Sequence, residues 1–303
     1  MKPTNRTSSL SFLLFFLFIF VGSFQTLADD HQSTKKISPL FWQLEFNGVK
    51  SYALGSIHLG NPSMYPLPAA IMSGFKASEA LAVEVNLSDD SNALMTRLSQ
   101  QYGMDAKRPL VSWLSPSTKK LYNQYCQKQG LPCQQFRLFK PWLVSVTFAS
   151  FGFMKSGYDP ELGIDRFFIS EASKSKKSVI SLETAESQFK LFADLSESLQ
   201  EELLLQSMSE NSDDLKLLID SWSQGDEDKL VSLFEEVENP ALKKVFIEQM
   251  LIKRNHKMAD GVQAQLKLGK RVFVVVGTAH LVGKDNVLTL LQKHGVKVTK
   301  QAL

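Results

Sequence analysis

The strongest pattern in the chain is an uninterrupted apolar run near the C-terminus, from Val272 to Val276, which Gly277 ends. Every residue in this run is β-branched or aromatic. Such a run is typical of a β-strand covered on both faces, as in the sheet of an α/β protein. Because Gly277 lets the backbone turn, we expect a loop after it at the carboxyl edge of the sheet, where ligands bind in open α/β sheets.

Shorter apolar segments and turn residues predict further strands. Residues 40–46 and 49–54 are separated by Asn-Gly, a dipeptide that favours the type I′ turn of a β-hairpin. Other apolar segments predict strands at residues 80–86, 178–183 and 296–299.

Apolar spacings of three and four residues predict helices between these strands. We expect helices at residues 67–78, from residue 163 onwards and at residues 287–294, and helical regions at 92–154 and 196–265. The sequence therefore predicts a single α/β domain at residues 38–303. Its mixed or parallel β-sheet would be packed with helices and would carry a largely helical insertion.

Residues 1–28 have the pattern of a secretory signal peptide. Two basic residues precede an apolar segment at residues 10–21, and small residues then allow cleavage after Ala28. The apolar segment is shorter than the roughly 20 residues that span a bilayer, which argues against an uncleaved anchor. We therefore expect a periplasmic or secreted protein that meets the membrane only through this signal peptide during export. Residues 29–37 are expected to form a flexible segment.

Charge and cysteine content narrow the classes of function. Removing residues 1–28 takes away two basic and no acidic side chains, which lowers the formal net charge from +3 to +1. Nucleic-acid binding requires a concentrated basic surface, so we expect no nucleic-acid partner. The two cysteines, Cys126 and Cys133, flank a Gly-Leu-Pro turn. In an exported protein, such a pair predicts a local disulfide bond.

Two histidines share one local sequence pattern. His58 and His280 each follow, by three residues, a glycine that ends a predicted strand, although the chain has only five histidines. Loops that follow parallel strands of one sheet leave it at the same edge. We therefore predict that the two loops are the halves of one site. His256 and His294 are expected at the surface.

Four charged residues are further candidates for this site. Glu84 lies in an apolar strand pattern, where a carboxylate needs partners unless the strand is at the sheet edge and Glu84 faces water. Glu183 ends a predicted strand, and it either caps the next helix or orients water or a histidine. For Asp165 we favour a helix N-cap over a place at the same edge of the sheet. Arg254 belongs to a Lys-Arg-Asn-His run, which alone indicates a solvated basic face.

Over roughly residues 39–301, the sequence resembles the TraB/GumN family, to which the Tiki-type metalloproteases are related. The resemblance implies the α/β fold that this family shares with erythromycin esterases and ChaN-like haem-binding proteins. It rests on the following segments: Gly-Ser-Ile-His58, Glu84, Gly-Ile-Asp165, Leu-Glu183-Thr-Ala-Glu-Ser-Gln188, Arg254-Asn255-His-Lys-Met258 and Gly-Thr-Ala-His280-Leu-Val-Gly283.

Tiki-type relatives are regarded as metal-dependent peptidases that use two Gly-x-x-His motifs and a glutamate. By that resemblance, His58, Glu84 and His280 are the expected ligands of a divalent metal ion (Mn, Co or Zn). Two imidazoles and one carboxylate that leave positions open are an ordinary ligand set for a catalytic metal. Such a metal would activate water to hydrolyse a peptide or protein substrate. Glu183 and Arg254 are the expected catalytic residues, because an inward guanidinium could pair with Glu84 or bind a carboxylate or an oxyanion.

Three alternatives stay open at this point. Without a metal, His58 would act as a general base oriented by Glu84 or Glu183. A protein that only binds peptides is the second alternative, since TraB-type members are linked to shutting down peptide pheromones, which sequestration would also achieve. The third is haem or iron binding, by analogy with ChaN-like proteins, and fold-level analogy does not decide among these functions.

Overall fold

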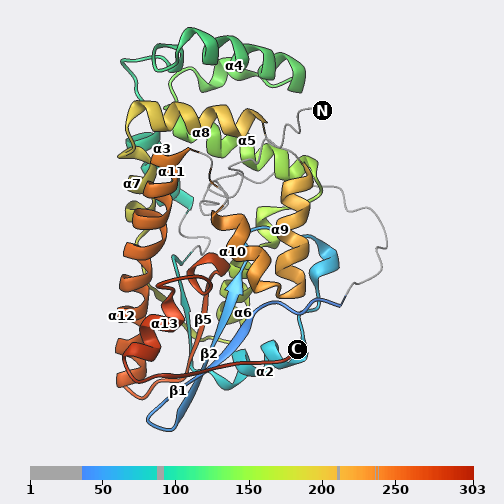
Figure 1. Ribbon diagram of the computed structural model, residues 1–303, viewed down its shortest axis with the longest axis vertical. Coiled ribbons are helices and arrows are strands. Elements are labelled where there is room, and N and C mark those ends of the chain that lie inside the picture. Colours follow the sequence, from blue (N-terminus) through green and yellow to red (C-terminus); the bar gives the residue numbers. More distant parts are fainter. Residues whose placement is uncertain (1–35, 87–91, 210–211, 236, 238) are drawn as a thin grey trace, which may run out of the picture.

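The computed structural model describes residues 36–86, 92–209, 212–235, 237 and 239–303. The prediction of a signal peptide at residues 1–28 lies outside the described residues. The fold is a single α/β domain built on a six-stranded sheet in the order β4-β3-β5-β2-β1-β6 (Figure 1). The strands are β1 (Phe41–Phe46), β2 (Val49–Ser56), β3 (Ala80–Val83), β4 (Ser178–Ser181), β5 (Val272–Gly277) and β6 (Lys297–Lys300).

The sheet is mixed, as predicted. Strands β4, β3, β5 and β2 pair in parallel, whereas β1 pairs antiparallel with both β2 and β6. The hairpin between β1 and β2 turns at Asn47 and Gly48, whose φ angles are 48° and 78°. Positive φ at both positions is what the type I′ turn requires, so the Asn-Gly signal is confirmed.

Strand β5 lies in the interior of the sheet, between β2 and β3, and all six of its residues are buried. This position explains its uninterrupted apolar run, because both faces of the strand are covered. On one face, the ring of Phe273 packs against Phe75 and Phe168, which come from α2 (Ala69–Ala77) and α6 (Ile164–Lys174).

Two helical regions leave the sheet, one between β3 and β4 and the other between β4 and β5. Helices α4 (Pro116–Gln129), α5 (Pro141–Lys155) and α8 (Glu197–Ser209) stack at the end of the molecule away from the sheet, and α12 (Lys253–Lys267) returns the chain to β5 (Figure 1). The remaining helices are α3 (Asn92–Gly103), α7 (Ala185–Ala193), α9 (Ser212–Gln224), α10 (Glu227–Glu235), α11 (Pro240–Val245) and α13 (Val287–Lys293). Within the described residues, no helix has both the length and the apolar content needed to cross a membrane.

The distal helices have their own small hydrophobic core, which includes Tyr122 of α4, Phe148 of α5 and Leu204 of α8. A disulfide bond joins Cys126 to Cys133, with 6.0 Å between their Cα atoms. It closes the turn between the end of α4 and the short 3₁₀ helix at Cys133–Phe136. The structure therefore contains the local disulfide that the cysteine spacing predicts.

The structure differs from the predicted strands in one respect that matters for the site. Strand β3 ends at Val83, so Glu84 lies just beyond the strand rather than inside it. Strand β3 is also an interior strand, between β4 and β5, and Glu84 is 5% exposed. The interpretation of Glu84 as a water-facing residue of an edge strand is therefore wrong. The carboxylate lies at the carboxyl edge of the sheet.

Candidate functional site

The two histidine loops lie side by side at the carboxyl edge of the sheet. Strands β2 and β5 are parallel neighbours, and their register pairs Gly55 with Val276 and Ser56 with Gly277. His58 therefore follows β2 at the level where His280 follows β5 in a short 3₁₀ turn, Thr278–His280. The prediction that both loops belong to one edge is confirmed.

Glu84 reaches both histidines with the same oxygen atom. Its Oε1 atom lies 3.9 Å from Nε2 of His58 and 3.8 Å from Nε2 of His280. The same oxygen accepts a hydrogen bond of 2.7 Å from the backbone N–H of Gly277, the residue that ends β5. The structure thus brings together the three residues that we expected to bind a metal.

Arg254 is buried and pairs with two carboxylates. Its Nη2 atom is 2.5 Å from Oε2 of Glu84 and 2.6 Å from Oε2 of Glu183, and its Nε atom donates to both oxygens of Glu183 at 3.0 and 2.9 Å. Its side chain is 5% exposed. The interpretation of the Lys-Arg-Asn-His run as a solvated face is therefore wrong for Arg254, although its neighbour His256 is exposed, as is His294.

A π-helix leads directly into the helix that carries Arg254. Residues Phe246–Ile252 form this π-helix (η6), and α12 follows without a break. Nη1 of Arg254 donates to the carbonyl oxygen of Met250 within η6 at 3.2 Å. One-turn π segments shift the register of a helix and are frequent at functional sites. Here the segment precedes a guanidinium that points inward.

Glu183 has a different set of partners from those predicted. Besides Arg254, it accepts a hydrogen bond of 3.2 Å from Nε2 of Gln188, which also donates to Oε2 of Glu84 at 3.1 Å. Helix α7 is capped by Thr184, whose side chain accepts from the N–H of Ser187. Glu183 is thus neither a cap nor an orienter of a histidine; it holds Arg254.

Both histidines are held by the ring nitrogen that points away from Glu84. Nδ1 of His58 lies 2.8 Å from Oδ2 of Asp165, and Nδ1 of His280 lies 2.6 Å from Oδ1 of Asn255. The interpretation of Asp165 as a helix N-cap is wrong, since Gly163 is the N-cap of α6. Sequence reasoning gave Asn255 no role. The available signal was its position directly after Arg254 in a helix that leads to the His280 loop.

The charges at the site give the three central groups very different pKa values. Burial raises the pKa of Glu84, but Arg254 and then the two histidines outweigh it and lower the pKa to about 2. Burial and then Arg254 lower the pKa of His280 to about 3, so this imidazole is neutral at pH 7. Burial also lowers the pKa of His58, but the Asp165 carboxylate outweighs it and raises the pKa to about 9.

The arrangement can be compared with the requirements of a metal ion. Ligands of a tetrahedral metal at about 2.1 Å are separated by about 3.4 Å, slightly less than the distances from Glu84 to each histidine. Nε2 of His58 is buried and makes no hydrogen bond with the described residues, as expected of a nitrogen available to a ligand. In the described part of the chain, no group of three or more His, Cys, Asp or Glu side chains is already in a metal-binding arrangement. The donor types fit a divalent metal, and each Nε2 atom would have to come a few tenths of an ångström closer to Oε1 of Glu84 to reach that separation.

A small cavity of about 20 Å³ adjoins His58. This volume is enough for about one water molecule. Ser56 also lines the cavity, and its buried hydroxyl makes no hydrogen bond with the described residues. Helices α9 and α10 supply the apolar wall, which consists of Leu218, Trp222, Leu230 and Phe234.

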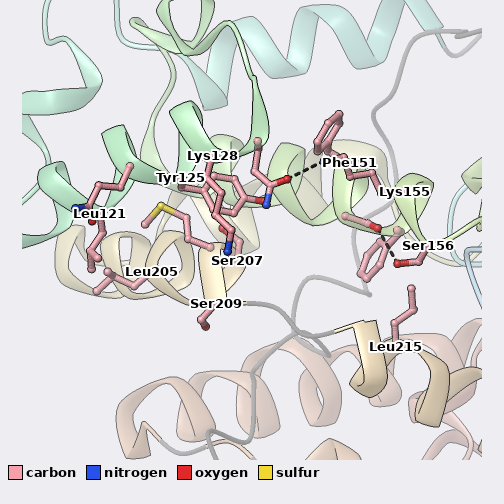
Figure 2. Close-up of a pocket in the computed structure, with 15 residues that line it drawn as sticks. Leu121, Tyr125, Lys128, Phe151, Lys155, Ser156, Leu205, Ser207, Ser209 and Leu215 are labelled. Atoms are coloured by element: carbon pink, nitrogen blue, oxygen red, sulfur yellow. Dashed lines mark hydrogen bonds between the residues drawn. The ribbon is translucent and has the colours of Figure 1, made fainter.

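A larger pocket of about 680 Å³ lies among the distal helices and shares no residue with this site (Figure 2). It is bounded by the C-terminal ends of α4, α5 and α8. Lys128 and Lys155 lie in the last turns of α4 and α5, where positive charge stabilises a helix C-terminus. Nζ of Lys155 donates to Gln129 at 2.8 Å. None of the described residues that line this pocket is a carboxylate or a histidine, whereas the sheet edge brings both kinds of side chain together.

Fold and site together define an α/β protein with a buried centre of two histidines, two glutamates and one arginine at the carboxyl edge of a mixed sheet. The chain belongs to the TraB/PrgY/gumN family, whose family model matches residues 40–300. The protein called "Uncharacterized protein YbaP" of Shigella flexneri is 26% identical over 249 residues, which cover 80% of this chain and 88% of YbaP. The protein of the same name from Escherichia coli (strain K12) is 25% identical over 248 residues, which cover 80% of this chain and 87% of that protein. No solved structure matches the chain.

Proposed function

We propose that this protein is a metal-dependent hydrolase of peptide or protein substrates, in which His58, Glu84 and His280 bind one divalent ion (Mn, Co or Zn). The observation that carries the proposal is the convergence of three donor atoms: both Nε2 atoms lie within 3.9 Å of one oxygen of Glu84. When bound, such an ion lowers the pKa of a water molecule and polarises a carbonyl group.

The chain's own residues prepare this site by balancing charge. Glu84 is ionised at neutral pH and faces the two imidazoles with Oε1, while its Oε2 atom is paired with Arg254. Glu183 holds the guanidinium from the other side. Because Nε and Nη2 of Arg254 are engaged with carboxylates, we assign Arg254 and Glu183 to positioning Glu84 and keeping it charged. Of the roles expected for an inward Arg254, this is the pairing with Glu84 rather than direct contact with an oxyanion.

The metal-free alternative requires His58 to act as a general base. Asp165 would orient it, rather than Glu84 or Glu183. The same carboxylate raises the pKa of His58 to about 9, so the ring is an imidazolium at pH 7 and cannot accept a proton. Binding of a metal at Nε2 would also require the loss of this proton. The pKa of His58 therefore counts against general-base catalysis, and the preference for a metal rests on the convergence of the three donors alone.

The other two alternatives receive less support. Peptide sequestration without cleavage is compatible with the buried pairing of Arg254 with Glu84 and Glu183, but it does not account for the convergence of both Nε2 atoms on Glu84. Haem binding gains no support from the cavity at His58, which measures about 20 Å³. The disulfide between Cys126 and Cys133 is consistent with an oxidising compartment, so we keep export to the periplasm or beyond as part of the proposal.

A peptide digest tests this function. The protein beginning at residue 29 is purified without reductant, stripped with EDTA and incubated with a mixed peptide library and Mn²⁺, Co²⁺ or Zn²⁺. We expect mass spectrometry to find new peptide termini with metal, none in EDTA and none with Glu84→Gln. Glu79→Gln, which changes an exposed glutamate near the opposite edge of the sheet, serves as the control and should retain cleavage. Cleavage that survives both EDTA and Glu84→Gln would overturn the proposal, and so would the absence of cleavage with every metal.

A further inference from the structure

Asn255 makes two hydrogen bonds that together fix which way its side-chain amide faces. Its Nδ2 atom donates to the backbone carbonyl oxygen of Asp285 at 3.0 Å, and its Oδ1 atom lies 2.6 Å from Nδ1 of His280. A carbonyl oxygen can only accept a hydrogen bond, so the NH₂ group must face Asp285 and the oxygen must face His280.

This orientation decides where the proton of His280 is. The amide oxygen of Asn255 is only an acceptor, so Nδ1 of His280 must carry the hydrogen that joins them. In a neutral imidazole, the other nitrogen then has the lone pair. Nε2 is the nitrogen that faces Glu84, at 3.8 Å from Oε1. The contacts of Asn255 therefore fix the hydrogen on Nδ1, and in the neutral ring they leave the lone pair on Nε2.

The backbone that orients Asn255 belongs to the loop that carries His280. Asp285 has a φ angle of 51°, and the turn around it is closed by Nδ2 of Asn286, which donates to the carbonyl oxygen of Gly283 at 2.7 Å. Asn255 is 2% exposed and lies between the two ends of this loop. Its neighbour in α12, Arg254, binds Glu84, so two consecutive residues of one helix contact two of the three expected ligands.

We propose that Asn255 is a positioning residue that locks His280 in the tautomer with hydrogen on Nδ1, so that Nε2 presents its lone pair to the site. The use of that lone pair to bind a metal rests on the proposed function, whereas the tautomer itself does not. An amide achieves this without adding a fourth carboxylate to Glu84, Glu183 and Asp165. Outer partners of this kind commonly change metal affinity by about 10- to 100-fold when they are removed.

Nitrogen NMR of the metal-free chain tests the lock directly. Spectra of protein with ¹⁵N-labelled histidine at pH 7 should show His280 as a neutral ring with hydrogen on Nδ1. Asn255→Ala should lose the preference for hydrogen on Nδ1. Asn255→Asp should keep hydrogen on Nδ1, because a carboxylate still accepts from it, but the added charge should shift the ring toward the imidazolium, as Asp165 does for His58. His256→Ala, an exposed neighbour on the same helix, is the control and should leave the His280 signals unchanged. A wild-type spectrum with hydrogen on Nε2 would overturn the proposal even if no variant folds.

Calorimetric titration with Zn²⁺ separates this inference from the proposed function. We expect the Kd to rise about 10- to 100-fold in Asn255→Ala and to change by less than about threefold in His256→Ala. If wild type binds no Zn²⁺ but shows the Nδ1-protonated ring, the proposed metal site fails and the tautomer lock stands. If Zn²⁺ binds equally well to wild type and to a folded Asn255→Ala protein, the positioning role is wrong.

Discussion

Replacing Arg254 by methionine tests whether the buried ion pairs hold the site together. Arg254 is the positive partner of two carboxylates whose side chains are 6% and 3% exposed. Removing one partner of a buried ion pair typically costs about 3–5 kcal/mol, because a charge is left in a poorly solvated place. Since domains of ordinary stability unfold with about 5–15 kcal/mol, the Arg254→Met protein should fold but melt early. Arg254→Lys should restore only part of the loss, because an ammonium cannot reproduce the two-sided contact of the guanidinium.

Urea denaturation of a double-mutant cycle measures this coupling. Glu183→Gln alone breaks the ion pair from the other side, and adding it to Arg254→Met removes one of the stranded carboxylates. The double variant should therefore be more stable than the sum of the single losses predicts, by about 0.5–3 kcal/mol. The exposed pair Arg271–Glu79, with side chains 52% and 50% exposed, is the matched control. The cycle of Arg271→Met and Glu79→Gln should show far weaker coupling. Equal stability of Arg254→Met and wild type, or strict additivity at the buried pair, would refute the reasoning.

Three further predictions concern the two histidines, the disulfide bond and the contact between the His58 loop and α6. In the metal-free chain, the pKa of His280 is lowered to about 3, so the unfolded chain binds a proton more readily than the folded one. The free energy of unfolding is therefore full above pH 6.5 and falls as the pH falls toward 3. The raised pKa of His58, about 9, adds stability that is present below pH 6.5 and lost as the pH rises through 9. Melting curves should therefore decline on both sides of about pH 6.5, with a flatter acid side in His280→Asn, and an unchanged acid side would contradict this assignment. Cys126→Ser should lower the free energy of unfolding by about 2.5 kcal/mol and leave peptide cleavage unchanged, and lost cleavage in the folded variant would show that the disulfide does more than brace the distal helices. Gly163→Ala would place a Cβ atom 2.7 Å from the carbonyl oxygen of His58, so denaturation should show a loss of about 1–3 kcal/mol, and no loss would mean that the loop and α6 are not in contact.

The parts of the fold that local sequence patterns determine were predictable. The Asn-Gly turn specifies its hairpin, and the apolar run at Val272–Val276 specifies an interior strand, because both signals depend on neighbouring residues only. The two glycine-histidine loops were predictable as one site because both repeat the same pattern of a strand, a glycine and a histidine three residues later, and the structure pairs their strands in parallel. The strand order was not predictable, since it depends on which distant segments pair.

The contacts that orient the site were harder to predict for the same reason. Asp165 and Asn255 lie 107 and 25 residues from the histidines that they hold, and a carboxylate or an amide near a helix start has many ordinary roles. Arg254 looked like part of a solvated basic run because its neighbours Lys253 and His256 are exposed, whereas Arg254 itself lies on the buried face of the same helix. Only the packing of α12 beside β5 shows which of these side chains points inward.

Diffraction from crystals of the metal-free protein soaked in Zn²⁺, collected at the zinc absorption edge, tests the central claim most directly. The account predicts one anomalous peak at about 2.0–2.2 Å from Nε2 of His58, Nε2 of His280 and a carboxylate oxygen of Glu84. Glu84→Gln crystals soaked in parallel should lose most of this peak. A wild-type map with no peak between the two histidines, or with zinc bound only elsewhere, would contradict the claim that these three residues form a metal site.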